Sequence, residues 1–416
     1  MKTKVFFLLY MFLTFFASAQ KENCGTKEKQ LSQFIAENDY EKANEVWNEI
    51  KVECPSFSEN VYLLGNKVLQ YNIEIADSKD KEKEVRELLK LYNQFDKNFP
   101  ENRNGNFEKR AMALYESKVG TNDEIYSYLD QAFSKQKKSF SNPQALLIYF
   151  EMYFEKYKLE KSSISIDNLL EKYTDINSLL EFNRLQFPAK INEYSRVASG
   201  MDSYMQNLLI CENLVPYAQK NFESNKSDVN WLLAAAQALS VKCNNKPIFE
   251  TIALELHNTK PSSKSAYYLA TYYLNTGNQD KSIAFFKESI ELTSDKNEKA
   301  TTAYTLASIL ASSDKAKSKE MMLVAMENNP SNGKYYIFLA NLYANAINDC
   351  ASTDIEKKGM YKLASDTALK AINIEPRYKI TAENMSKDYL KNVVFDSKSK
   401  VKSVHLRCWI NQTVQF

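Results

Sequence analysis

Between residues 263 and 294, apolar and small side chains recur three or four residues apart on both sides of one polar interruption. The positions concerned are Leu269, Ala270, Tyr273, Gly277-Asn278, Ser282, Phe286 and Ser289. Such spacing places side chains on one face of a helix, and a glycine between two helical segments permits a tight turn. The pattern predicts two amphipathic helices joined by a short turn, with small residues where the helices cross.

Residues 300–330 and 336–376 repeat this unit, and residues 24–55 carry a further copy. These copies are recognised at Leu306-Ala307, Ser318, Met322, Ala325, Leu339-Ala340, Tyr343, Ala364, Ala368 and Ala371, and near the N-terminus at Phe34, Asn38-Asp39-Tyr40, Ala43, Trp47 and Ile50. The third copy holds an insertion of about a dozen residues around Asn348 to Gly359, relative to a common repeat length. Val229 to Lys242 predicts another first helix, whereas Leu63-Leu64-Gly65 and Ala132 are only fragments of the pattern.

The prolines form two series. Intervals of 43 to 45 residues separate Pro55, Pro100, Pro143 and Pro188, and intervals of 69 and 46 residues separate Pro261, Pro330 and Pro376. Proline cannot donate the hydrogen bond of a helix interior, so it concentrates where helices end. The prolines therefore indicate regular helix ends, with a long period in the N-terminal half and a more regular array in the C-terminal half.

The C-terminal residues follow a different period. Apolar side chains occupy the even positions Val404, Leu406, Cys408, Ile410, Val414 and Phe416. Alternation of this kind predicts a strand with one buried face. We expect a small β-hairpin in which Asn392 to Phe395 pairs with this strand across Asp396-Ser397-Lys398.

Composition agrees with a helical chain too long for one core. Only 8 Gly and 9 Pro occur among 416 residues, and a chain of this length is expected to form several domains or a repeat array. Lys2, Lys4, the apolar stretch Val5 to Phe16 and Ala17-Ser18-Ala19 have the order of a secretory signal peptide, predicted over residues 1–19. A membrane anchor would need about 20 apolar residues, and no cysteine stands directly after the small residues as in a lipoprotein.

Without residues 1–19 the chain has 54 − 2 = 52 basic and 52 acidic residues. A net charge of zero argues against nucleic acid and against anionic lipid as partners. No later segment is apolar enough to span a membrane, so we expect a periplasmic or secreted protein.

Six cysteines remain after the signal peptide, an even number that favours disulfides in an exported chain. Cys24 and Cys54 bracket one helical hairpin. Cys211 and Cys243 flank a turn near Asn225 at 14 and 18 residues, nearly level on two antiparallel helices. Cys350 and Cys408 remain for a third pair. The alternative is that one or two of the cysteines are reduced core residues.

The repeated pattern resembles the tetratricopeptide repeat (TPR). Together with the loop Asn348-Asp349-Cys350 and the tail Cys408-Trp409-Ile410, it resembles an exported TPR family of Bacteroidetes type that has no assigned function. The resemblance implies an all-α fold of helical hairpins stacked into a right-handed superhelix, ended here by the β-hairpin. A helical bundle without repeats is the alternative. The expected divisions are a signal peptide at 1–19, long-period repeats at 20–188, a regular array at 189–380 and a tail at 381–416.

In TPR proteins the first helix of each pair lines the concave side. By that register the resemblance implies a binding face of Lys264, Tyr267, Thr271, Asn275, Thr301, Tyr304, Ser308, Ser312, Lys334, Ile337, Asn341 and Asn345. Its hydroxyls and amides suit the polar groups of a peptide or a glycan, and its rings offer stacking area. The alternative is that Tyr267 and Tyr304 only pack between repeats.

No catalytic motif is present. The sequence lacks the phosphate-loop, Gly-x-Ser-x-Gly, His-Glu-x-x-His and Rossmann glycine patterns. His257 is interpreted as a surface or capping residue and His405 as an outward residue of the strand, and zinc is disfavoured because no Cys-x-x-Cys occurs. We expect no enzyme activity, no cofactor and no metal.

The expected function is a scaffold of the cell envelope that presents its concave groove to a protein or peptide partner. The alternative is a glycan-binding protein related to starch-capture outer-membrane proteins, and a hydrolase with two ordinary carboxylates comes third.

Overall fold

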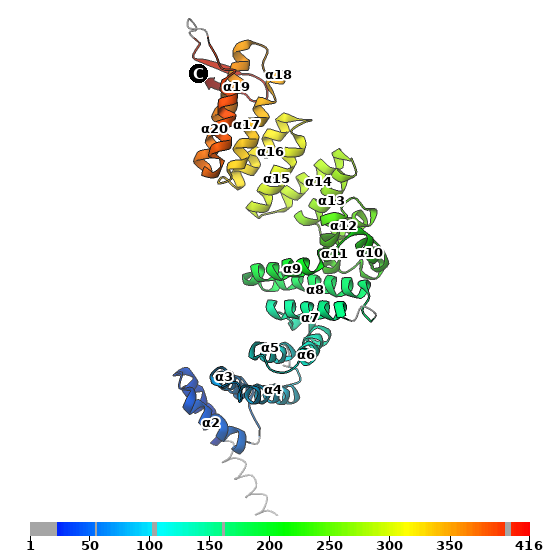
Figure 1. The fold of residues 1–416 in the computed structure, drawn as a ribbon, viewed down its shortest axis with the longest axis vertical. Coiled ribbons are helices and arrows are strands. Elements are labelled where there is room, and N and C mark those ends of the chain that lie inside the picture. Colours follow the sequence, from blue (N-terminus) through cyan, green and yellow to red (C-terminus); the bar gives the residue numbers. More distant parts are fainter. Residues whose placement is uncertain (1–22, 55, 102–105, 160–162, 396–400) are drawn as a thin grey trace, which may run out of the picture. The chain divides into compact units, whose positions relative to one another are not determined.

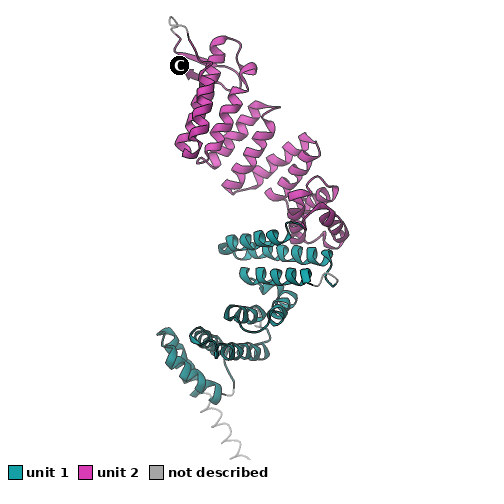
Figure 2. Cartoon of the chain, in the orientation of Figure 1, with its two compact units in different colours: residues 1–207 teal, residues 208–416 magenta. Residues whose placement is uncertain are grey.

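The computed structural model describes residues 23–54, 56–101, 106–159, 163–395 and 401–416. The expected signal peptide, Pro55 and the expected turn at Asp396-Ser397-Lys398 lie outside them. The chain divides into two compact units, residues 1–207 (unit 1) and 208–416 (unit 2), coloured separately in Figure 2. In the described ranges the regular structure is helical except for one two-stranded antiparallel hairpin near the C-terminus. The expected all-α class with a short β-hairpin is confirmed.

Unit 1 is a succession of helices packed as hairpins (Figure 1). After a helix over residues 23–36 come α2 (Tyr40–Glu53), α3 (Glu59–Ile75), α4 (Lys81–Asn98), α5 (Asn106–Ser117), α6 (Asn122–Lys135), α7 (Pro143–Leu159), α8 (Ile166–Gln186) and α9 (Ile191–Met205). α3 packs on α4, α5 packs on α6, and α7 contacts both α8 and α9.

The first hairpin of unit 1 has the features expected from residues 24–55. Asn38 adopts the left-handed conformation in the turn, with φ of 57°, and Asp39 caps α2 by accepting from the Lys42 amide. Trp47 is buried and lies against Gly65 of α3. A Cβ on Gly65 would stand 2.5 Å from the Trp47 ring. The glycine therefore lets the backbone of α3 approach the indole.

Unit 2 continues the hairpins and ends in the β-hairpin (Figure 1). Its elements are α10 (Cys211–Asn225), α11 (Val229–Lys242), α12 (Pro247–Thr259), α13 (Ser263–Asn275), α14 (Gln279–Leu292), α15 (Lys296–Leu310), α16 (Lys315–Asn328), α17 (Gly333–Ala344), α18 (Ile347–Cys350), α19 (Asp354–Ile374), α20 (Lys379–Leu390), β1 (Ser403–Leu406) and β2 (Gln412–Gln415). α11 has the bounds that the sequence predicts for a first helix. The most extensive helix contacts are α13 with α14, α15 with α16 and α17 with α19.

Small residues meet where these helix pairs cross. The Ser282 hydroxyl of α14 donates to the Ala270 carbonyl of α13 over 2.9 Å. The Ser318 hydroxyl of α16 donates to the Ala307 carbonyl of α15 over 2.7 Å. All four residues are buried, and a satisfied buried hydroxyl contributes about 1 kcal/mol. The helical-hairpin units expected over 263–376 are thereby confirmed.

The prolines of the two series that lie in the described residues stand at helix boundaries. Pro100, Pro261 and Pro330 follow α4, α12 and α16. Pro143 instead opens α7, where a missing amide proton costs nothing, and Pro188 and Pro376 open short 3-10 turns directly after α8 and α19. The series therefore marks element boundaries, both ends and starts.

The insertion in the third repeat of unit 2 is mostly helical. α18 is a single turn, and Asp354 to Gly359 form the start of the long helix α19 rather than a loop. A capping box fixes that start, because Thr353 and Glu356 each accept a backbone hydrogen bond from the other's segment.

The β-hairpin corrects the strand pairing expected from the sequence. Val404 to Phe416 is not one strand paired with Asn392 to Phe395. It folds back on itself, with Val404 opposite Val414 and Leu406 opposite Gln412. The expected alternation of buried side chains is confirmed for Leu406, Ile410 and Val414, which are buried. The turn was missed because Cys408-Trp409-Ile410 carries no Gly or Pro to mark it.

The hairpin packs on α19. A Cβ on Gly359 would stand 2.3 Å from Val404 of β1, so the strand lies directly on the helix backbone at this point. Cys350 and Cys408 are disulfide-bonded, with Cα atoms 5.3 Å apart, and the Lys319 ammonium donates to the Ile410 carbonyl. The other expected pairs, Cys24–Cys54 and Cys211–Cys243, are also present. None of the described cysteines is free.

Candidate functional site

The side chains expected on the concave face come from α13, α15 and α17, the first helices of three consecutive hairpins, except for Asn345, which caps the end of α17, and Ser312, which follows α15. Those that are exposed are Asn275, Thr301, Ser308, Ser312, Lys334, Asn341 and Asn345. Those that are half-buried are Lys264, Tyr267, Thr271, Tyr304 and Ile337. The exposed members, together with the half-buried Tyr267, Thr271 and Tyr304, form the first candidate surface, called here the array face.

The aromatic members of the array face take part in packing. The Tyr304 ring stacks on Tyr335 at 5.5 Å between centroids and contacts Phe338 edge-on at 5.6 Å. The Lys334 ammonium lies 4.5 Å from the centre of the same ring. Tyr267 meets Phe286 of its own hairpin edge-on. Tyr304 thus joins α15 to α17, and its ring already contacts three side chains.

The hydroxyls of the array face are turned toward their own helices. Thr271, Thr301 and Ser308 each donate to the carbonyl four residues earlier, over 2.8 to 2.9 Å. A hydroxyl that donates in this way keeps its oxygen lone pairs as acceptors. These side chains can therefore accept hydrogen bonds from a ligand, whereas the donors on the face are the amides and Lys334.

Asn341 is oriented by a neighbour. The Tyr389 hydroxyl of α20 donates to its side-chain oxygen over 2.9 Å, which leaves the amide NH2 directed away from that bond. Lys264 donates to the Gln237 side-chain oxygen of α11 over 3.0 Å. Ile337 packs against a small apolar cluster with Ala340, Ala368 and Ala382. Asn341 is thus a pre-oriented donor, while Ile337 supports the helix contact.

His257 is an internal link, contrary to the expectation of a surface or capping residue. Its Nδ1 lies 2.9 Å from the Ser265 hydroxyl of α13 and its Nε2 lies 3.2 Å from a Glu288 oxygen of α14. The ring joins α12, α13 and α14. His405 lies on the exposed side of β1, as expected, with Nδ1 3.0 Å from the Thr413 hydroxyl across the hairpin.

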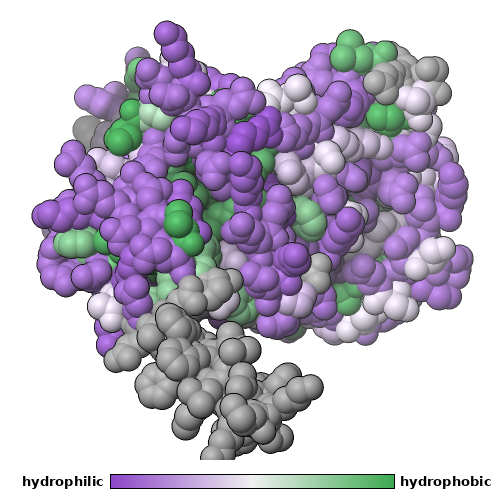
Figure 3. Space-filling model, turned by 90° about the horizontal axis from the view of Figure 1, so that it is seen from below, coloured by the Kyte–Doolittle hydropathy of each residue, from purple (hydrophilic) through white to green (hydrophobic). Residues whose placement is uncertain are grey.

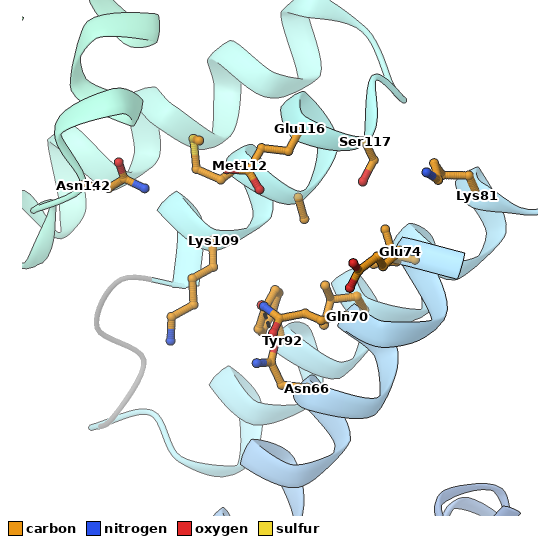
Figure 4. Close-up of a pocket in the computed structure, with 13 residues that line it drawn as sticks. Asn66, Gln70, Glu74, Lys81, Tyr92, Lys109, Met112, Glu116, Ser117 and Asn142 are labelled. Atoms are coloured by element: carbon orange, nitrogen blue, oxygen red, sulfur yellow. Dashed lines mark hydrogen bonds between the residues drawn. The ribbon is translucent and has the colours of Figure 1, made fainter. Parts of the chain in front are cut away.

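A second candidate site lies in unit 1, where the sequence singled out nothing. A cavity of about 600 Å³ opens between α3, α4 and α5 (Figure 4). Its walls come from Asn66, Gln70, Ile73 and Glu74 of α3 and from Lys109, Met112, Ala113, Glu116 and Ser117 of α5. Lys81, Leu88 and Tyr92 of α4 and the Asn142 side chain complete it.

The polar groups of this cavity are only partly paired. The Tyr92 hydroxyl donates to the Asn66 side-chain oxygen over 2.6 Å, and burial raises the pKa of Tyr92. The Lys109 ammonium is 3.4 Å from the Asn106 side-chain oxygen. In the part of the chain that the structure describes, Glu74, Glu116 and Lys81 make no ion pair or side-chain hydrogen bond. The cavity therefore presents charged groups that are available to a ligand.

The α5 wall is held firmly in place. The Arg110 guanidinium is buried and pairs with Asp96 of α4 over 2.5 Å. Glu108 accepts from the backbone amides of Ser141 and Asn142 ahead of α7. Burial raises the pKa of Glu108, and these two hydrogen bonds oppose that rise. Removing one partner of such a buried pair is costly, so α5 has a fixed register between its neighbours.

The described residues contain no group of three or more His, Cys, Asp or Glu side chains placed to hold a metal ion. Over the same ranges, no helix combines the length and the hydropathy that a membrane crossing requires. The face seen in Figure 3 is mostly hydrophilic, with apolar residues among the polar ones. Large apolar side chains such as Val52, Leu159 and Ile380 are exposed.

No protein-family model matches the sequence, and no curated protein matches it. Among solved structures, the chain is similar to the Cut9-Hcn1 APC/C hetero-tetramer, with 10% identity, 88% of this chain and 83% of that chain covered, and a TM-score of 0.31. It is also similar to yeast Tom70, with 12% identity, coverages of 90% and 82%, and a TM-score of 0.26. The Naa15/Naa10 complex bound to HypK-THB gives 13% identity, coverages of 91% and 69%, and a TM-score of 0.24. These global similarities are low, and the fold assignment rests on the helix pairing within each unit.

Proposed function

We propose that this protein is a non-catalytic scaffold of the cell envelope that binds a protein partner through an extended peptide segment laid along the array face. The observation that carries the proposal is the row of exposed amide and ammonium donors on α13 and α17 or at the end of α17, namely Asn275, Lys334, Asn341 and Asn345. The Ser308 and Thr301 oxygens add acceptors to the same row. A peptide backbone requires both kinds of group at regular intervals.

Two features support an envelope location. Residues 1–19 have the pattern of a signal peptide. All six described cysteines lie in disulfides, which persist in oxidising compartments and are rare in the cytosol. The proposed compartment is therefore the periplasm or the cell exterior.

A peptide fits the array face better than a glycan. Sugar rings stack on open aromatic faces, but Tyr304 is in contact with Tyr335, Phe338 and Lys334. Tyr267 is engaged with Phe286. Amides and a single lysine then remain as the principal groups for recognition.

The test compares two double variants in affinity capture from envelope extract. Lys334→Ala/Asn341→Ala removes two donors from α17, and Lys287→Ala/Glu327→Ala makes matched truncations at exposed positions of the second helices α14 and α16. We expect one dominant captured protein that is lost with the first variant and retained with the second. Retention with both, or capture of carbohydrate alone, would reject the proposal.

A further inference from the structure

The cavity of unit 1 is part of a longer groove. A second cavity of about 180 Å³ shares Asn66, Tyr92 and Lys109 with it and extends along α3 to Glu59. From Glu59 to Glu74 the helix rises about 22 Å at 1.5 Å per residue. An extended chain covers that length in about seven residues at 3.3 Å each. The groove therefore has the length of a heptapeptide rather than of a single small molecule.

Side chains that can pair with a peptide backbone line this groove. Asn66, Gln70 and Asn142 bring carboxamides to the groove, and the Asn142 oxygen already accepts from the Gln144 and Ala145 amides, so its NH2 is the group left for a ligand. Asn106 also lines the groove, but it is buried and its NH2 donates to Asp96. The Tyr92 hydroxyl holds the Asn66 oxygen, so the Asn66 NH2 is left as a donor. Leu88 and Met112 provide apolar surface between the polar groups.

Two acidic and two basic side chains line the groove. Glu74 comes from the α3 wall and Glu116 from the α5 wall, and neither has a partner among the described side chains. In Figure 4 these two carboxylates lie between Lys109 on one side of the cavity and Lys81 on the other. The centre of the cavity is thus acidic and its two sides are basic.

We propose that this groove binds an extended polypeptide segment with one basic side chain at its centre and acidic residues on either side of it. The basic side chain lies between Glu74 and Glu116, and the flanking acidic residues lie near Lys81 and Lys109. Along α5, Lys109 and Glu116 are seven residues apart, about 10 Å, which corresponds to about three residues of extended chain. A segment with several consecutive basic residues is disfavoured, since the two lysines would repel it.

This groove belongs to unit 1, and it shares no residue with the array face of unit 2. The two sites differ in chemistry, because the array face offers one lysine and no acid, whereas the groove sets two carboxylates between two lysines. Substitutions in one unit therefore test one proposal and leave the other untouched.

The first arm of the test is a positional-scanning array of immobilised heptapeptides probed with the full chain. Each position is fixed in turn as one amino acid while the others are randomised. We expect Lys or Arg to be selected at one central position, and Asp or Glu about three residues away. No selection of a basic residue would overturn the proposal.

The second arm uses the best heptapeptide in fluorescence polarisation. Glu74→Gln/Glu116→Gln is expected to weaken binding about tenfold, since exposed ion pairs contribute up to about fivefold each. Glu74→Lys/Glu116→Lys is expected to switch the preferred central residue to Asp or Glu. Glu45→Gln, at an exposed acid of α2 outside the groove, is the control and leaves affinity unchanged.

Unaltered affinity and selection with the Glu74 and Glu116 variants would overturn the inference. Melting curves show that each variant is folded. Lys334→Ala/Asn341→Ala is included as a second control. Loss of heptapeptide binding in that variant would place the peptide on the array face, which overturns the groove inference and not the proposed function.

Discussion

The hairpins of unit 2 and the groove of unit 1 differ in the side chains that face each other between neighbouring helices. In unit 2, Ser282 meets Ala270 and Ser318 meets Ala307 where the two helices of a hairpin cross. Both serine hydroxyls are buried, and each donates a hydrogen bond to the carbonyl of its alanine partner. In unit 1, the facing sides of α3 and α5 carry long polar side chains such as Gln70 and Lys109. These sides of the helices line a cavity, whereas other side chains of α3, such as Val68 and Leu69, pack into a core. Small residues at a crossing close a hairpin, and long polar ones leave room for a ligand.

The largest expected effect comes from enlarging one alanine at a helix crossing and one alanine in the wall of the cavity. Ala307 is fully buried at a crossing, whereas Ala113 lines the cavity. Ala307→Leu is expected to lower the free energy of unfolding by about 3 kcal/mol, since overpacked cores force side chains and backbone to move. Ala113→Leu should change it by less than about 1 kcal/mol. Urea unfolding followed by circular dichroism measures both, and equal losses would contradict the comparison.

Removing the Cys350–Cys408 disulfide tests what holds the tail on α19. These cysteines are 58 residues apart, and a cross-link over such a loop contributes about 2 to 4 kcal/mol. Cys350→Ser/Cys408→Ser is expected to raise amide exchange over 401–416 and to leave exchange in unit 1 unchanged. Protection of the tail equal to that in the unaltered chain would show that the packing of Val404 on Gly359 is sufficient.

A glycine pair sharpens the account of unit 1. Gly65→Ala places a methyl group 2.5 Å from the Trp47 ring and is expected to cost about 2 kcal/mol. Gly25→Ala meets no atom within 4 Å in the helix over residues 23–36 and should stabilise that helix by up to about 1 kcal/mol. If α3 does approach the Trp47 ring this closely, thermal unfolding gives a lower melting temperature for Gly65→Ala and a higher one for Gly25→Ala.

The smallest expected difference in the free energy of unfolding is between alanine substitutions of two serines in unit 2. Ser318→Ala leaves a buried site without its hydrogen bond to Ala307 and should cost about 1 kcal/mol. Ser308→Ala removes an exposed hydroxyl bonded to its own helix, with a change within about 0.5 kcal/mol. Equal effects would mean that the crossing hydrogen bond adds nothing to stability.

Much of unit 2 was predictable because its signals are local. The glycine turn at Gly277, with φ of 84°, and the alanine and serine positions each require only neighbouring residues to be recognised. The Cys24–Cys54 and Cys211–Cys243 disulfides followed from positions in helical hairpins, and Cys350–Cys408 followed by elimination. The strand pairing of the tail could not be predicted, because alternation of apolar residues indicates which face of a strand is buried and not which segment pairs with it.

The groove of unit 1 was missed for a physical reason. Asn66, Gln70 and Glu74 are four residues apart on α3, which from sequence reads as an ordinary solvated helix face. Only the distance to α5 distinguishes a groove from a surface. That distance depends on contacts such as Arg110 with Asp96, between residues whose pairing the sequence does not reveal.

The most direct test of the proposed function is site-specific photo-crosslinking in intact cells. A benzophenone amino acid is placed at Ser308 or Asn341 on the first helices, and at Lys287 or Glu327 on the second helices. We expect the same protein to be cross-linked from both first-helix positions and from neither second-helix position. Cross-links to that protein from the second helices alone, or none to protein from any position, would contradict the proposed function.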